Sequence, residues 1–176
     1  MRLDKLTIKA QDAIQLAQNI ADRKSHQQID VEHLLCALLE QKESIISRLV
    51  QKLGADPGQL QREVTDALSR QPQVYGSGVT GGMYITPRLK KVLDAAQAEA
   101  DRMKDEFISV EHLFIAIADQ GGPPAGEILA RHGVNRDTIL RVLMDIRGTQ
   151  RVTDQNPEDK YQALERFSRD LTELAR

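Results

Sequence analysis

The chain has 176 residues, enough for one compact domain or two small ones that bury roughly two thirds of the surface exposed by the unfolded chain. Hydrophobic residues make up 40% and charged residues 28%, as in ordinary globular proteins, whereas aromatic residues make up only 3%. The net charge of −2, without a basic stripe or an aromatic stacking surface, argues against a nucleic-acid partner.

The first residues, Met1 to Lys5, alternate in charge and lead into a polar helical pattern. They contain neither the apolar run of a signal peptide nor the roughly 20 apolar residues of a membrane span. We therefore expect a cytoplasmic protein without a membrane partner.

Four helices are predicted over the first 70 residues, because capping and stopping residues punctuate the pattern. The hydroxyl of Thr7 can accept from the free N–H groups of a first turn, and Asp30 can do the same for a second helix. Gly54 can end a third helix in the left-handed conformation, and Asp56 with Pro57 can begin a fourth.

The second helix contains the only cysteine of the chain, Cys36, between Leu35 and Ala37. A single cysteine excludes an internal disulfide and a cysteine-rich zinc site. We expect Cys36 to be a small buried apolar residue in a protein from a reducing compartment.

A linker is predicted over residues 71–84, since its proline and glycines interrupt regular structure. The pattern of the first half then returns at an offset of 79 residues, which aligns Val31-Glu32-His33-Leu34 with Val110-Glu111-His112-Leu113. The same offset, without a gap, aligns Thr7 with Thr86 and Gly54 with Gly133.

The fold is therefore expected to be all-α, with eight helices in two pseudo-symmetric repeats of four. The repeats span about residues 6–70 and 85–148. Each has more apolar surface than it can bury alone, so we predict one domain over residues 1–148.

The pattern lapses after Gly148 and resumes in an amphipathic helix from Tyr161 to Leu174. Residues 149–176 are interpreted as a linker and a leading helix that continue toward a missing domain. With few contacts on the approach, we expect this segment to be mobile or to pack on a neighbouring molecule.

No motif in the chain indicates catalysis, a metal or a nucleotide. His33 and His112 fall at the third helical position, where capping is the expected role, and no zinc-ligand spacing surrounds them. The glycines of 76–82 lack the Gly-Lys-Ser/Thr ending of a phosphate loop. Glu32 and Glu111 fit either first-turn acids that complement the helix dipole or acidic rims that bind peptide donors.

Four segments together resemble the N-terminal region of the ClpB family of chaperones: Met1–Thr7, Val31–Leu39, Ile108–Leu113 and Ala163–Arg176. The duplicated helical unit is shared with ClpA and ClpC, whereas the two ends of the chain favour ClpB. The resemblance covers the whole chain.

This resemblance implies the substrate-engaging N-terminal domain of an ATP-dependent disaggregase, which binds unfolded or aggregated polypeptide in stress recovery. It implies that the isolated domain is monomeric, has no cofactor and is not an enzyme. The full-length protein is expected to be a homohexameric AAA+ ATPase that uses ATP and magnesium and works with DnaK-type chaperones. The polypeptide-binding residues of the family correspond to Thr7, Asp105 and Glu111.

The alternative is an adaptor-docking N-domain of the ClpA or ClpC type. Such a domain would bind one folded partner tightly through a fixed surface, whereas a substrate-engaging domain would bind many unfolded chains weakly.

Overall fold

The structure, a computed structural model, describes residues 3–72, 84–148, 151–153, 155 and 157. Eight α-helices are present in this part of the chain, in two sets of four, as predicted. The first set is α1 (Ile8–Arg23), α2 (Val31–Glu40), α3 (Ile45–Lys52) and α4 (Pro57–Ser69). The second set is α5 (Pro87–Arg102), α6 (Val110–Gln120), α7 (Ala125–Arg131) and α8 (Arg136–Arg147). A short 3-10 helix η1 (Leu3–Lys5) precedes α1.

The predicted capping residues begin and end these helices. The hydroxyl of Thr7 accepts from the N–H of Ala10 at 3.2 Å, and that of Thr86 accepts from the N–H of Leu89 at 3.1 Å. Gly54 follows α3 with a φ of 83° and Gly133 follows α7 with a φ of 74°, which only glycine adopts without a steric cost.

Two short parallel pairings, absent from the sequence prediction, join the two halves. Strand β1 (Gln28–Ile29) pairs with β2 (Tyr84–Ile85), and Leu6 forms an isolated parallel bridge with Ile108. The 79-residue offset makes Leu6 equivalent to Ile85, and Ile29 equivalent to Ile108. The two pairings are therefore the same contact with the halves exchanged, as a pseudo-twofold arrangement requires.

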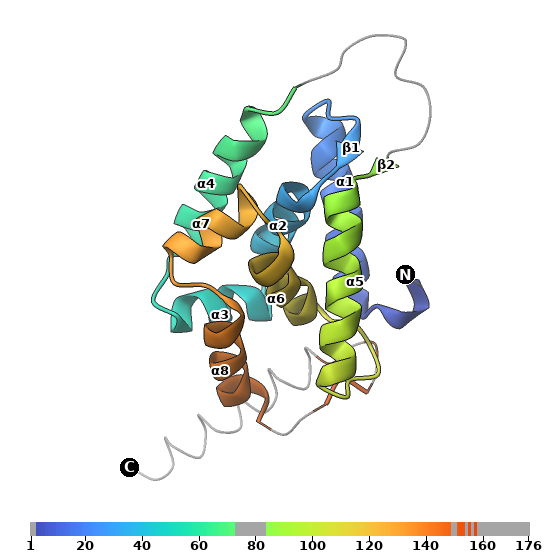
Figure 1. The fold of residues 1–176 in the computed structure, drawn as a ribbon, viewed down its shortest axis with the longest axis vertical. Helices are drawn as coiled ribbons and strands as arrows, with labels where there is room; N and C mark the ends of the chain where they lie inside the picture. Colours follow the sequence, from blue (N-terminus) through green and yellow to red (C-terminus); the bar gives the residue numbers. More distant parts are fainter. Residues whose placement is uncertain (1–2, 73–83, 149–150, 154, 156, 158–176) are drawn as a thin grey trace.

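The core is centred on α2 and α6, which lie in the middle of the molecule with the other helices around them (Figure 1). Residues 31–39 of α2 and 110–117 of α6 are all buried. Contacts join α1 and α2 to α6, α2 to α5, α3 to α8 and α4 to α7, so each helix of one half packs on the other half. The two repeats consequently share one core, as the surplus of apolar residues predicted.

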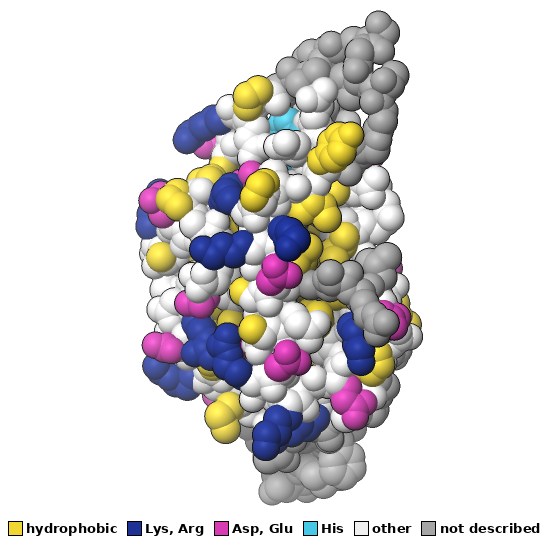
Figure 2. Space-filling view, turned by 45° about the vertical axis from the view of Figure 1, so that its right-hand side comes forward, with side chains coloured by type: hydrophobic (Ala, Val, Ile, Leu, Met, Phe, Trp, Pro, Cys, Tyr) yellow, Lys and Arg dark blue, Asp and Glu magenta, His cyan; other side chains and the backbone are white. Residues whose placement is uncertain are grey.

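The surface carries both signs of charge. Figure 2 shows lysine and arginine side chains interspersed with aspartate and glutamate on the face that it presents. Within the part of the chain that the structure describes, no helix is long and apolar enough to span a bilayer.

Candidate functional site

The two histidines of the repeat cap their own helices. Nδ1 of His112 accepts from the N–H of Ser109 at 2.8 Å, and Nδ1 of His33 accepts from the N–H of Asp30 at 2.9 Å. The capping role predicted for both is therefore confirmed. With Nδ1 used as an acceptor, the neutral ring carries its proton on Nε2, which is left to donate elsewhere.

The Nε2 atoms point to different partners in the two halves. Nε2 of His112 donates to Oδ2 of Asp105 at 2.7 Å, whereas Nε2 of His33 lies 2.8 Å from Nδ1 of His26. His26 and Asp105 are equivalent under the 79-residue offset. A carboxylate thus stands in the second half where a neutral ring stands in the first.

Asp105 accepts hydrogen bonds from three residues. Besides His112, Nη2 of Arg147 donates to Oδ1 at 2.7 Å and the main-chain N–H of Val152 donates to Oδ1 at 2.8 Å. Burial alone would raise the pKa of Asp105, but these hydrogen bonds outweigh it and lower the pKa to about 2. Asp105 is therefore a charged acceptor at neutral pH, and its side chain is 0% exposed.

Glu111 is fully buried in the first turn of α6. Its Oε1 lies 3.6 Å from Nη1 of Arg147, and neither carboxylate oxygen accepts a hydrogen bond from the described residues. Arg147 therefore lies between two carboxylates, those of Asp105 and Glu111. The structure thus brings two of the three predicted contact residues together through one guanidinium group.

Thr7 is also fully buried. Its side chain caps α1, and its main-chain N–H donates to the carbonyl of Ile108 at 2.9 Å. Ile108 lies three residues before Glu111 and three after Asp105 in the chain. Thr7 thus contacts the segment that connects the other two predicted residues, through main-chain atoms rather than through its hydroxyl.

Val152 and Gln155 lie against this region of the domain. The N–H of Glu106 donates to the carbonyl of Val152, and the N–H of Ile8 donates to the carbonyl of Gln155, both at 2.8 Å. Val152 is fully buried. This result differs from the expectation of few contacts after Gly148, because the contacts are made by main-chain groups that leave no pattern in the sequence. The predicted helix from Tyr161 to Leu174 lies outside the described residues.

Arg147 is the residue of this site that the sequence analysis missed. It is 5% exposed at the end of α8, on the buried face of that helix. The offset aligns Arg147 with Leu68, a core residue of the first half. A charge at a position that is apolar in the other repeat is a signal that could have found it.

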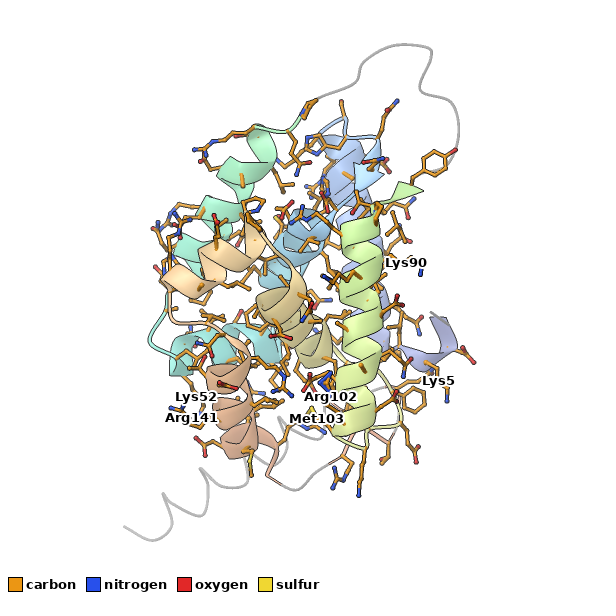
Figure 3. All side chains as sticks on the ribbon, in the orientation of Figure 1. Lys5, Lys52, Lys90, Arg102, Met103 and Arg141 are labelled. Carbon is orange, nitrogen blue, oxygen red and sulfur yellow. The ribbon has the colours of Figure 1, made fainter. Side chains whose placement is uncertain are left out.

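An apolar recess of about 580 Å³ is bordered by Arg147 and Arg151. Figure 3 labels two of its lining residues, Met103 at the end of α5 and Arg141 on α8. Leu140, Leu143 and Met144 supply apolar surface, and Met144 is 69% exposed.

The equivalent acid of the first half, Glu32, is engaged in a different way. Nη2 of Arg88 donates to its Oε2 at 3.0 Å, and the N–H of Ala125 donates to the same oxygen at 3.3 Å. Glu32 is thus a buried structural acid rather than an exposed rim. Glu111 is equally buried, so neither acid forms an open acidic rim in this structure.

Cys36 is buried, as predicted, and burial followed by the neighbouring Glu40 raises the pKa of its thiol to about 11. Among the described residues, no three histidine, cysteine or acidic side chains gather in a cluster that could hold a metal ion.

Comparison with known proteins places this arrangement in a family. The family described as "Clp repeat (R) N-terminal domain" matches residues 5–132. The chaperone protein ClpB of Bacillus anthracis is 40% identical over 172 residues, which are 97% of this chain and 20% of that protein. The chain spans about a fifth of the length of the curated relatives that it matches.

Two solved structures share the fold. The Hsp104 N-terminal domain of Candida albicans has a TM-score of 0.75 at 21% identity, covering 88% of this chain and 99% of that one. A ClpV N-domain in complex with a VipB peptide has a TM-score of 0.63 at 19% identity, covering 80% and 85%.

The duplicated four-helix unit and these matches define the class: the chain belongs to the family of Clp repeat N-terminal domains. Since relatives at about 40% identity that cover nearly the whole chain are ClpB chaperones, it is a ClpB-type N-terminal domain.

Proposed function

We propose that this domain binds unfolded or aggregated polypeptide and passes it to the AAA+ hexamer of a cytoplasmic ClpB-type disaggregase. The domain performs no catalysis. ATP and magnesium act on the ATPase modules of the full-length protein, which works with DnaK-type chaperones. The ClpB relatives support this proposal, and so does a solved domain of the same fold that holds a peptide.

The observation that carries the proposal is how Val152 and Gln155 are held beside the predicted contact residues. Asp105 and the N–H groups of Glu106 and Ile8 bind main-chain atoms of Val152 and Gln155, neither of which belongs to a helix or a strand. Main-chain recognition does not depend on sequence. A domain that must accept many different unfolded chains needs this kind of contact.

Binding is expected to be weak. Ordering a disordered client consumes several kcal/mol of contact energy, and a threading motor has to release its substrate. We expect dissociation constants of roughly micromolar to millimolar, or about 4 to 8 kcal/mol of binding free energy.

A titration of the domain with fluorescent unfolded casein tests the proposal. Weak saturable binding that other unfolded chains displace is the expected result. Absence of binding up to millimolar concentrations contradicts it. Tight binding of one folded adaptor, without binding of casein, supports the adaptor-docking alternative instead.

The place of binding is tested by a matched pair of variants, Thr7→Ala and Thr86→Ala. Both residues cap a helix, so each change should cost about 0.5 to 2 kcal/mol of stability. Only Thr7 adjoins Ile8, which donates to residue 155, so only Thr7→Ala should weaken casein binding. Equal casein affinity of both variants argues against this location.

A further inference from the structure

We propose that Val152 and Gln155 are a resident ligand of the polypeptide-binding site, and that a segment of an unfolded client protein binds by replacing them. The inference rests on the proposed function, since it names the place and the mode of polypeptide binding. The partner is a short non-helical stretch of polypeptide, held mainly by its main chain.

Val152 provides the first and most specific anchor. Its N–H donates to Oδ1 of Asp105, and its carbonyl accepts from the N–H of Glu106, each at 2.8 Å. Both main-chain polar groups of one residue are thus paired by the domain. Any residue except proline, which has no N–H, can make the same two hydrogen bonds.

The second anchor is the N–H of Ile8, which binds Gln155, three residues after Val152. The N–H of Ile8 belongs to the first turn of α1, where it has no partner within the helix. It donates to the carbonyl of Gln155. Thr7 holds this turn in place by capping Ala10, so Thr7 acts on the ligand indirectly, as a positioning residue.

Glu111 also acts indirectly. Arg147 donates to Oδ1 of Asp105, the same oxygen that accepts from Val152, and Glu111 lies 3.6 Å from the other end of that guanidinium group. Removing Glu111 takes away the carboxylate beside the second nitrogen of this guanidinium group. Asp105 and Glu111 therefore act at the first anchor and Thr7 acts at the second, although all three side chains are buried.

The side chain of the bound segment adds a preference of its own. Val152 is fully buried, so a small apolar residue fits at the first anchor. Arg151, next to it, borders the apolar recess that also contains Met103 and Met144. Methionine side chains adapt to different apolar groups, so a client with a large apolar residue at this position gains contact that the resident Arg151 does not make.

The first half cannot offer a second copy of this site. At the equivalent positions, 79 residues away, His26 corresponds to Asp105 and Pro87 corresponds to Ile8. Proline has no N–H. The carboxylate that accepts from Val152 and the N–H that donates to Gln155 are therefore missing there. We expect one client segment per domain.

The test compares two variants of the whole chain, Val152→Asp and Thr153→Asp. Both add one negative charge, but Val152 is buried in the domain whereas Thr153 is exposed. Val152→Asp should release the segment and bind unfolded casein roughly tenfold more tightly, because an intramolecular competitor has been removed. Thr153→Asp should bind casein like the parent.

A synthetic peptide with the sequence of residues 149–158 provides the second arm. Added to Val152→Asp, it should displace casein in proportion to its concentration. In amide exchange, the N–H groups of Ile8 and Glu106 should lose protection in Val152→Asp and regain it when either the peptide or casein binds.

Val152→Pro is the replacement variant if Val152→Asp lowers the melting temperature. It removes the N–H that donates to Asp105 and adds no charge. Casein affinity equal to that of the parent in both Val152 variants, or a peptide that does not compete, overturns the inference while leaving the proposed function intact. Absence of casein binding by the parent and by all variants contradicts both this inference and the proposed function.

Discussion

His33 and His112 occupy the same position in the two repeats, yet their partners give them different electrostatic settings. His112 donates to a charged carboxylate, whereas the partner of His33 is a second imidazole ring, that of His26. Burial, followed by the proximity of His26, lowers the pKa of His33 to about 4. His33 is therefore neutral in the native protein at pH 5, where an unfolded histidine is mostly charged.

Stability should consequently fall on acidification from pH 6.5 to pH 4. His33 binds a proton near pH 6.5 in the unfolded state and only near pH 4 in the native state. Through this residue the free energy of unfolding should fall by about 3 kcal/mol between pH 6.5 and pH 4. Asp105, whose pKa is lowered to about 2, loses its own contribution only below pH 4. Urea unfolding between pH 7 and pH 4 measures this, with His33→Gln as the variant that should flatten the curve. An unchanged pH slope in His33→Gln contradicts the assignment.

Arg88 connects elements that belong to different halves. It projects from the first turn of α5 to Asp30 and Glu32 at the start of α2, at 3.0 Å from each, and it donates to the carbonyl of Gly121 at 2.8 Å. The offset places Lys9 in the equivalent position, and its Nζ donates to the carbonyl of Lys42, the counterpart of Gly121. The helix-to-loop contact is thus repeated in both halves, and Arg88 in addition pairs with the buried acid Glu32.

Arg88→Met should lower the free energy of unfolding by roughly 2 to 4 kcal/mol. Glu32 would remain a fully buried carboxylate without its cation, and the partial exposure of Arg88 places the loss at the lower end for a buried pair. Lys90→Met is the matched control, because Lys90 pairs with Asp94 on the open surface and should cost less than about 0.5 kcal/mol. Chemical denaturation compares the two. A loss in Arg88→Met no larger than in Lys90→Met refutes the role of this pair.

The molecule as a whole shows which features a sequence can reveal. Helix boundaries at Thr7, Asp30 and Gly54 were predictable because capping depends on residues within one turn. The pairing of Leu6 with Ile108 was not, since a two-residue contact across 102 positions has no local pattern. The bound state of Val152 escaped prediction for a related reason: its contacts are made by main-chain groups, which every residue has.

Neither repeat should fold alone. Both parallel strand pairings join one half to the other. The helices α2 and α6 each bury an almost complete helix surface against elements of both repeats. Separate chains of residues 3–72 and 84–157 would expose that surface, and about 70 residues with an incomplete core fall below what a stable domain needs. Far-UV circular dichroism with urea should give no cooperative transition for either chain. An equimolar mixture should regain helix and unfold cooperatively, at a midpoint that rises with concentration. The intact chain cleaved between residues 73 and 83 is the control, because it starts from the assembled state. A sigmoidal transition of one half by itself, with helix content matching its share of the intact chain, would show that the repeats are independent domains.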